Sequence, residues 1–260
     1  MGKKHNNLSG LSRFVSQAFE QTPLPDSPST PQTQPQPTKK RKTGLLGPEN
    51  ESYDATDVVP FFTEASQVPE HLQKYFSQRK RFFSLYDEGC LLDEEGWFSV
   101  TPEAIASQIA ERCRCNTILD AFCGVGGNAI AFARTCERVI ALDTSPTRLA
   151  LARHNAAIYG VVDRIEFVLA DYLSFARSQS SNSSSTRKID VVFLSPPWGG
   201  PSYLSNPDLP EDQSVDDVHP SYSLSSVQPV HGKELFNISR QITPNVAFYL
   251  PRNTVLDDIA

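Results

Sequence analysis

No run of apolar residues in this 260-residue sequence approaches the roughly 18 that a membrane-spanning helix needs, so we expect no membrane segment. The first ten residues, MGKKHNNLSG, lack the apolar stretch of a secretory signal peptide. A disulfide framework is absent as well, since the sequence has only five cysteines, an odd number, and their spacing shows no such pattern. Together these absences predict a reduced, intracellular setting.

Clustered metal ligands and an excess of positive charge are also missing. Cys113 and Cys115 lie two positions apart, but no partner ligands accompany them, so we expect no bound metal. The formal net charge is −6 and the isoelectric point is about 5.4. This balance excludes a protein coated in basic residues, and any contact with nucleic acid should be local.

The first 60 residues differ from the rest of the chain in composition. The stretch TPLPDSPSTPQTQPQPT is rich in Pro, Gln, Ser and Thr and has little to bury, so residues 1–60 are predicted to form a disordered tail. The tail contains four adjacent cations, Lys39, Lys40, Arg41 and Lys42. Such a run resembles a nuclear-import signal that an import receptor would bind, and a solvated charge run is the alternative interpretation.

Residues 61–112 are predicted to form a helical extension. Leu72, Tyr75, Phe76, Phe82 and Tyr86 recur at roughly helical spacing from Pro69 onward, and Gly89 should end that helix. A second helix should follow, with Thr101 as its cap and Pro102 at its first position.

Residues 113–260 alternate between strand and helix patterns. Strands are predicted over 116–122, 138–143, 164–171, 188–195 and 245–251, and helices over 126–136, 145–160 and 232–242. Nearly continuous apolar strands that alternate with helices predict an α/β fold, with a parallel Rossmann-like sheet covered by helices on both faces.

Two polar segments interrupt the pattern. We expect a flexible serine-rich loop at 177–188 and a mobile flap at 203–230, where the charged residues are Asp208, Glu211, Asp212, Asp216 and Asp217.

Three carboxylates follow the first three predicted strands. Asp120 precedes a turn with glycines at 124, 126 and 127, and ligands of open α/β sheets bind at the carboxyl ends of the strands. Asp143 is placed to accept the hydroxyls of a ribose, Asp171 an adenine amino group, and Asp120 an ammonium. These three groups describe S-adenosylmethionine. A dinucleotide site is the rival interpretation, and each Asp alone could be a helix cap or turn residue.

A second candidate site, SPPW, follows the fourth predicted strand, next to the methyl donor. The Ser195 side chain and the Pro196 carbonyl could accept N–H bonds from an exocyclic amine of a purine, and Trp198 could hold the base flat. A buried tryptophan at a structural turn is the alternative.

Several segments resemble the trimethylguanosine synthase family, namely DAFCGVGGN, LARHNAAIYG, DVVFLSPPWGGPSY, EGWFSVTPE and FYLPRN. The resemblance runs from about Lys74 to Ala260. Proteins of that family resemble class I methyltransferases in fold. They use S-adenosylmethionine to convert the 7-methylguanosine cap of small nuclear and nucleolar RNAs to the 2,2,7-trimethyl form. The resemblance therefore implies a cap guanosine-N2 methyltransferase of the nucleus or nucleolus.

The resemblance also implies roles for single residues. Those implied for the methyl donor are Thr101, Asp120, Gly124, Asp143 and Asp171. Ser195 and Pro196 would hold the 2-amino group, with Trp198 stacked on the methylated guanine. The residues implied for the rest of the cap are Phe83, Ser99 and Asn155 in the pocket and Lys74 and Arg252 at the phosphates.

One departure from the family concerns the end of the sheet. Class I methyltransferases continue past the fifth strand with a helix and an antiparallel hairpin, whereas VLDDIA follows here, so we expect these C-terminal strands to be missing.

Two rival functions stay open. One is an adenine amino-methyltransferase acting on nucleic acid, which usually has Asp or Asn before the prolines and Tyr or Phe after them. The other is a non-catalytic cap-binding module.

Overall fold

The computed structural model describes residues 44–180, 188–198 and 221–259. Several sequence-based expectations lie outside this part of the chain. They are the import signal at Lys39 to Lys42, most of the serine-rich loop, and the acidic residues Asp208, Glu211, Asp212, Asp216 and Asp217. In chain order the described elements, with η for 3-10 turns, are η1 (Pro48–Tyr53), η2 (Ala65–Gln67), η3 (Glu70–Leu72), α2 (Gln73–Phe76), α3 (Arg79–Phe82), η4 (Tyr86–Glu88), α4 (Glu94–Ser99), α5 (Glu103–Arg112), β1 (Thr117–Asp120), α6 (Gly127–Thr135), β2 (Arg138–Asp143), α7 (Pro146–Ile158), η5 (Val162–Arg164), β3 (Ile165–Leu169), α8 (Tyr172–Ser180), β4 (Val191–Leu194), η7 (Leu224–Ser226), α9 (Gly232–Arg240), β5 (Val246–Phe248) and η8 (Leu256–Asp258).

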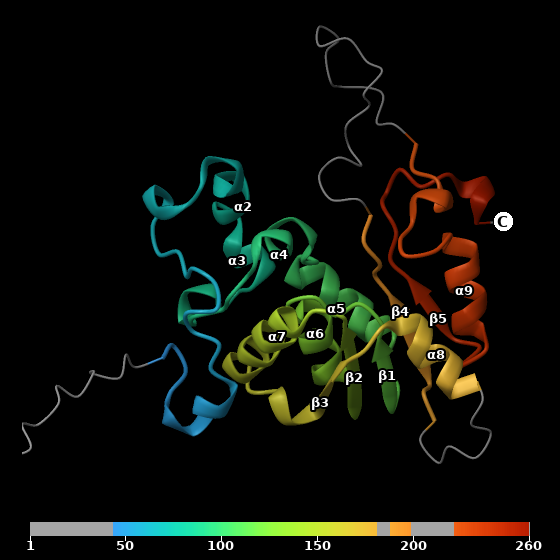
Figure 1. Ribbon diagram of the computed structural model, residues 1–260, viewed down its shortest axis with the longest axis horizontal. Coiled ribbons are helices and arrows are strands. Elements are labelled where there is room, and N and C mark those ends of the chain that lie inside the picture. Colours follow the sequence, from blue (N-terminus) through green and yellow to red (C-terminus); the bar gives the residue numbers. More distant parts are fainter. Residues whose placement is uncertain (1–43, 181–187, 199–220, 260) are drawn as a thin grey trace, which may run out of the picture. The chain divides into compact units, whose positions relative to one another are not determined.

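The five described strands form one parallel sheet in the order β3-β2-β1-β4-β5 (Figure 1). The chain starts in the middle of the sheet, moves outward to β3, and then crosses back to β4 on the other side of β1. All five predicted strands are present. The order reverses at β1 and β4, and in open α/β sheets ligands bind at such a switch point.

Successive strand residues bury on opposite faces of the sheet, because side chains alternate along a strand. Ile118 and Val139 belong to a core that includes residues of α5, α6 and α7, whereas Leu119 and Ile140 belong to a second core with residues of α8 and α9. Figure 1 shows these two groups of helices. Helices on both faces confirm the predicted class of fold.

Helix α8 was not predicted. Tyr172, its first residue, is buried, and its hydroxyl hydrogen-bonds the Ser239 hydroxyl of α9 at 2.6 Å. The helix runs through Ser180, so residues 177–180, which were expected to be loop, are helical. The predicted loop was chosen from its serine content, but the tertiary contact of Tyr172 anchors these residues as helix.

The helical extension is broken into short pieces, which corrects the expectation of one helix from Pro69 to Gly89. Helices α2 and α3 have four residues each, and 3-10 turns flank them. Phe76, Tyr86 and Trp97 pack together with ring centroids 5.5–6.2 Å apart. These rings come from different turns and meet at one point, so the chain bends around them instead of continuing as a helix.

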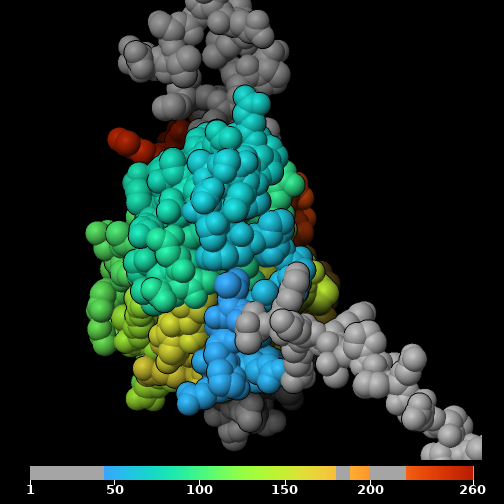
Figure 2. Space-filling model, turned by 90° about the vertical axis from the view of Figure 1, so that its left-hand side faces the viewer, coloured from blue at the N-terminus to red at the C-terminus, as the bar shows by residue number. Residues whose placement is uncertain are grey.

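Order begins well before residue 60, which corrects the predicted extent of the tail. Ala55 is buried, and its N–H donates to His154 Nδ1 in α7 at 3.1 Å. His154 Nε2 in turn lies 3.0 Å from the carbonyl oxygen of Gly89. Figure 2 shows the blue-to-cyan surface of this N-terminal segment against the yellow-green surface of later residues. All the described residues belong to one compact unit, so the division at residue 113 separates the sheet from its extension but not two structural units.

Helix α5 begins one residue later than predicted, with Pro102 as its cap. The Thr101 hydroxyl instead accepts a hydrogen bond from Asn128 Nδ2 at 3.0 Å.

Within the described residues, no helix combines the length and the apolar character needed to cross a membrane. Strand β5 is the last strand of the sheet among these residues, and the chain after it pairs through Thr254 with Tyr222.

Candidate active site

A cavity of about 1080 Å³ lies at the carboxyl ends of β1, β2 and β4. Its wall is built from the turns that follow these strands and from α4 and the residues around it. The predicted site residues in this wall are Ser99, Thr101, Gly124, Asp143, Asp171, Ser195, Pro196 and Trp198. The fold therefore brings together residues of the predicted donor site and of the SPPW turn, as expected for two reactants that must meet.

Asp143 holds the glycine-rich turn. Its Oδ2 accepts the Gly124 N–H at 3.0 Å and its Oδ1 accepts the Ser145 N–H at 2.8 Å. Gly124 has a φ of +52°, a left-handed conformation that favours glycine, although an added Cβ would meet open space. The carboxylate thus links the end of β2 to the turn after β1, and the turn stays open toward the cavity.

Gly126 is required for a different reason. Its φ is +93°, and a Cβ added there would lie 3.1 Å from the Cβ and 3.2 Å from the Cα of Ala152 in α7. The glycine lets the start of α6 approach α7 closely. This contact fixes the direction in which the turn faces the ligand.

Asp120 lies beneath the cavity wall and does not line it. The side chain is fully buried, and neither carboxylate oxygen forms a hydrogen bond of normal geometry with any described residue. Burial raises the pKa of Asp120 to about 7; the nearby Phe122 N–H lowers it in part and the charge of Asp143 raises it further. A buried carboxylate without a hydrogen-bond partner destabilises the folded protein unless a cation or a hydrogen-bond donor binds it. This electrostatic setting fits a positively charged ligand.

Asp171 serves as a helix cap, the alternative that the sequence left open. Its Oδ2 accepts the Ser174 N–H at 2.8 Å at the start of α8. Burial alone would raise the pKa of Asp171, but the Ser174 hydrogen bonds outweigh it and the pKa is lowered. Since Asp171 is exposed at the cavity, the capping role leaves the carboxylate able to accept from a ligand as well.

The SPPW turn lies where the prediction put it, directly after β4. Ser195 Oγ donates to the Phe122 carbonyl at 3.3 Å, which ties the turn to the end of β1. Pro196 is buried and Trp198 is half-buried. The Trp198 ring lies 5.2 Å from the Tyr249 ring at an interplanar angle of 45°. Trp198 also contacts the second core, so it is packed on one side and lines the cavity on the other.

Sequence reasoning missed several aromatic residues of the cavity. Tyr75 and Phe98 pack edge-on at 5.4 Å, and both line the wall near Ser99. The Ser99 hydroxyl donates to the Glu95 carbonyl at 2.8 Å. Lys74 is exposed, with its Nζ 4.8 Å from the centroid of the Tyr75 ring. The signal for Phe98 was its place in EGWFSVTPE, beside the predicted Ser99.

Phe83 and Asn155 do not line the cavity, contrary to the expectation from the resemblance. Asn155 is buried, donates to the carbonyls of Leu91 and Val125, and accepts the Leu91 N–H, so its amide fixes the backbone around the site. Phe83 is buried against the Tyr159 ring at 6.0 Å. We assign both a supporting position. Arg252 is exposed and is not part of the described wall.

Arg148 lines the cavity and was also missed. Its Nε donates to Asp93 Oδ2 at 3.1 Å and its Nη2 pairs with Glu95. Burial lowers the pKa of this guanidinium, but the two carboxylates outweigh that effect and raise it. The ion pairs join α7 to α4, so they tie the sheet domain to the helical extension at the cavity.

A family profile described as RNA cap guanine-N2 methyltransferase matches residues 115–260. The chain belongs to this family. It is 37% identical to trimethylguanosine synthase of Schizosaccharomyces pombe over 216 residues, which cover 81% of this chain and 83% of the relative. It is 38% identical to trimethylguanosine synthase of Saccharomyces cerevisiae over 196 residues, 73% of this chain and 57% of that protein. The predicted resemblance and the assignment as a methyltransferase are confirmed.

Two solved methyltransferase structures share less sequence with this chain. The S-adenosylmethionine-dependent methyltransferase of Agrobacterium tumefaciens is 21% identical, with a TM-score of 0.31 over 36% of this chain and 32% of that chain. The tRNA m1G37 methyltransferase of M. jannaschii is also 21% identical, with a TM-score of 0.29 over 36% of this chain and 27% of that chain. The strand order and the family match establish the fold.

Proposed function

We propose that this protein transfers methyl groups from S-adenosylmethionine to the exocyclic 2-amino group of a 7-methylguanosine RNA cap, giving the 2,2,7-trimethyl form. The observation that carries the proposal is that the glycine-rich turn with Asp143 and the SPPW turn with Trp198 open onto one cavity. A donor and a flat acceptor base could therefore lie side by side. Family membership supports the same reaction.

The donor would lie on the side of the cavity formed by Thr101, Gly124, Asp143 and Asp171. The residues there fit a cationic ligand, because Asp120 carries an orphaned buried carboxylate beneath the wall. The sulfonium of S-adenosylmethionine, when bound, supplies an electrophilic methyl group. Asp143 would accept the ribose hydroxyls with the lone pairs that its two backbone hydrogen bonds leave unused.

The acceptor amine would be held by Ser195 and Pro196. In the described structure the Ser195 hydroxyl donates its proton to the Phe122 carbonyl, so its lone pairs are directed to accept an N–H from the substrate. The Pro196 carbonyl is a second acceptor. Orientation would supply much of the rate enhancement. No His or Lys lines the described part of the cavity, so proton removal would not depend on a strong general base there.

Trp198 would stack on the methylated guanine. A 7-methylguanine ring is cationic, and an electron-rich indole attracts a cation over its face by about 1–2 kcal/mol. Tyr249 packs against the indole and would hold its plane. Lys74 and Arg252, which are both exposed, are the candidates for the cap phosphates.

The substrates we propose are capped small nuclear and nucleolar RNAs, which place the protein in the nucleus or nucleolus. The cations Lys39, Lys40, Arg41 and Lys42 would bind an import receptor. Replacing these four residues by alanine in a large fluorescent fusion tests that part. A fusion that remained nuclear would show that the run is an ordinary solvated patch.

The experiment that tests the reaction uses labelled S-adenosylmethionine with three RNAs, which carry a 7-methylguanosine cap, an unmethylated guanosine cap or no cap. We expect label in the 7-methylguanosine cap alone, recovered as N2-methylated guanosine after digestion. Label in adenosine of all three RNAs would identify an adenine amino-methyltransferase. Binding of the capped RNA without any label would identify a non-catalytic cap-binding module.

A further inference from the structure

The cavity is acidic along its donor side. Asp143 and Asp171 line it there, and Asp93 and Glu95 are joined to the same side through Arg148. Arg148 is the one Lys or Arg in the described wall, and both of these carboxylates already engage it. The acidic side repels a polyanion, so an RNA chain attached to a bound cap must leave the cavity elsewhere.

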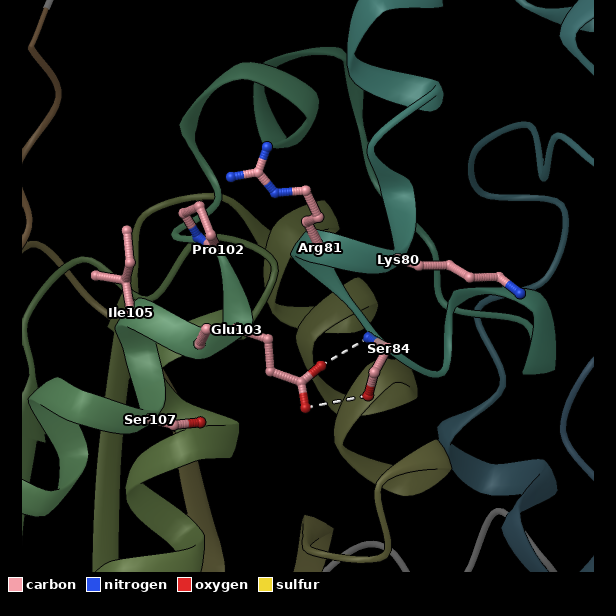
Figure 3. Close-up of a pocket in the computed structure, with 8 residues that line it drawn as sticks. Lys80, Arg81, Ser84, Pro102, Glu103, Ile105 and Ser107 are labelled. Carbon is pink, nitrogen blue, oxygen red and sulfur yellow. Dashed lines mark hydrogen bonds between the residues drawn. The ribbon is translucent and has the colours of Figure 1, made fainter.

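A second pocket of about 400 Å³ borders the cavity. Pro102 lines both hollows. Gln78 lines the large cavity and accepts a hydrogen bond at 2.8 Å from Arg81 Nη1, which belongs to the second pocket. Figure 3 shows the Arg81 guanidinium extending toward Pro102, with Lys80 pointing away from it. The two hollows therefore lie next to each other, with Pro102 in the wall of both and Gln78 of the first bonded to Arg81 of the second.

Arg81 has a charge that the described protein does not neutralise. The residue is exposed, its side chain donates to the neutral amide of Gln78, and no described carboxylate forms a salt bridge with it. Its neighbours differ. Lys80 Nζ lies 2.7 Å from Asp87 Oδ2, and Arg79 Nε lies 3.2 Å from Asp87 Oδ1.

The one carboxylate of the second pocket is already occupied. Glu103 accepts from the Ser84 N–H at 2.6 Å and from the Ser84 hydroxyl at 3.1 Å (Figure 3). It also accepts from the Tyr159 hydroxyl at 2.8 Å. Arg134 lies 3.4 Å from the same group. These donors compensate the negative charge of the Glu103 carboxylate, so the guanidinium of Arg81 is the dominant charge on the pocket.

We propose that the second pocket receives the first nucleotides that follow the cap, with the Arg81 guanidinium bound to a backbone phosphate. The inference depends on the proposed function, since a cap in the large cavity sets where the RNA begins. A planar guanidinium can bind two phosphate oxygens at once. The contact carries no base information, so it would raise affinity for every capped RNA sequence alike.

The test measures the affinity of the full chain for two fluorescent ligands, 7-methylguanosine triphosphate and a 7-methylguanosine-capped hexaribonucleotide, across a range of salt concentrations. We expect the wild type to bind the capped oligonucleotide more tightly. Arg81→Ala should bind the capped oligonucleotide roughly two- to tenfold more weakly, with the log–log salt slope reduced by about 0.7, and should bind 7-methylguanosine triphosphate as the wild type does. Arg112→Ala, which removes the same charge from the far end of α5, is the control and should change neither affinity. Arg81→Lys should recover part of the loss, because it keeps the charge but not the fork.

The outcomes separate the inference from the proposed function. If 7-methylguanosine triphosphate binds the wild type but Arg81→Ala retains the full advantage of the oligonucleotide, the RNA leaves by another route and the inference is wrong. An equal loss for both ligands in a folded Arg81→Ala variant also overturns it, because Arg81 would then contact the cap. Failure of the wild type to bind 7-methylguanosine triphosphate at all would contradict the proposed function itself.

Discussion

Asp143 should be the residue whose loss separates donor binding from cap binding most clearly. Its carboxylate accepts two backbone N–H bonds, at 3.0 Å from Gly124 and 2.8 Å from Ser145. The side chain is only 9% exposed, so these donors would be left without partners in Asp143→Ala. Hydrogen bonds to a charged group contribute about 1.5–3 kcal/mol each, so unfolding free energy should fall by about 3 kcal/mol or more.

The donor should lose affinity in addition to the loss of stability. A carboxylate that accepts two ribose hydroxyls contributes roughly 2–3 kcal/mol, which corresponds to roughly 30- to 150-fold in the dissociation constant. The cap should be affected little, because its proposed contacts at Ser195 and Trp198 follow a different strand. Asp143→Asn keeps the side-chain size but offers its amide group to one of the two backbone donors, so it should resemble the alanine variant.

Calorimetric titration of each ligand separately provides the measurement, at a temperature where thermal unfolding shows the variant folded. S-adenosylhomocysteine can replace the donor, so that no turnover occurs. The reasoning is refuted if a folded Asp143→Ala protein binds the donor as tightly as the wild type. A parallel loss of donor and cap affinity would show that Asp143 holds the whole cavity together, and not the donor alone.

The remaining predictions concern the cap, pH and the glycine-rich turn. Trp198→Ala should lose nearly all cap turnover, and Trp198→Phe should keep part of the stacking, which is worth about 1–3 kcal/mol per base. Trp198→Leu should bind methylated and unmethylated guanosine triphosphate alike. If the ratio of these two affinities stays constant across the series, Trp198 does not have this role. Burial lowers the pKa of His154 below its ordinary 6.5, so the folded protein should be fully stabilised above pH 6.5 and lose stability as the pH falls toward the folded pKa. Urea titrations from pH 7.5 to 5.5 would reveal this loss, and a His154→Gln variant with the same pH dependence would show that another group is responsible. Gly126→Ala should destabilise the fold by about 1–3 kcal/mol, since its φ is +93° and an added Cβ would crowd Ala152. Gly160→Ala, where φ is +67° and an added Cβ meets open space, should lower the melting temperature less. Equal decreases in melting temperature for the two variants would count against the crowding argument.

The alternating part of the chain could be predicted from the sequence because its pattern is local. Continuous apolar strands and helices of period 3.6 place five strands and α6, α7 and α9 within a few residues of their observed bounds. The positions of Asp143 and Ser195 follow from that pattern, since each stands at the end of a strand. Segments such as SPPW and EGWFSVTPE identified the family, because several residue types at fixed spacing are seldom shared by chance.

Tertiary structure decided what local patterns cannot encode. The aromatic residues after Pro69 repeat at helical spacing, yet their rings meet around Trp97, so packing energy breaks the helix into short turns. Asn155 has the polarity of a binding residue, but the fold surrounds it with backbone groups that its amide must satisfy.

The charge left on Arg81 is likewise a tertiary property. The sequence RKR presents three adjacent cations, and only the fold shows that Asp87 engages the first two while the third faces a pocket. A salt bridge depends on the distance between charged atoms, which a sequence does not specify for residues several positions apart. The sequence by itself therefore determined the family, the sheet and the positions of the residues at the strand ends, whereas the proposed path beyond the cap depends on which side chains the folded chain leaves without a partner charge.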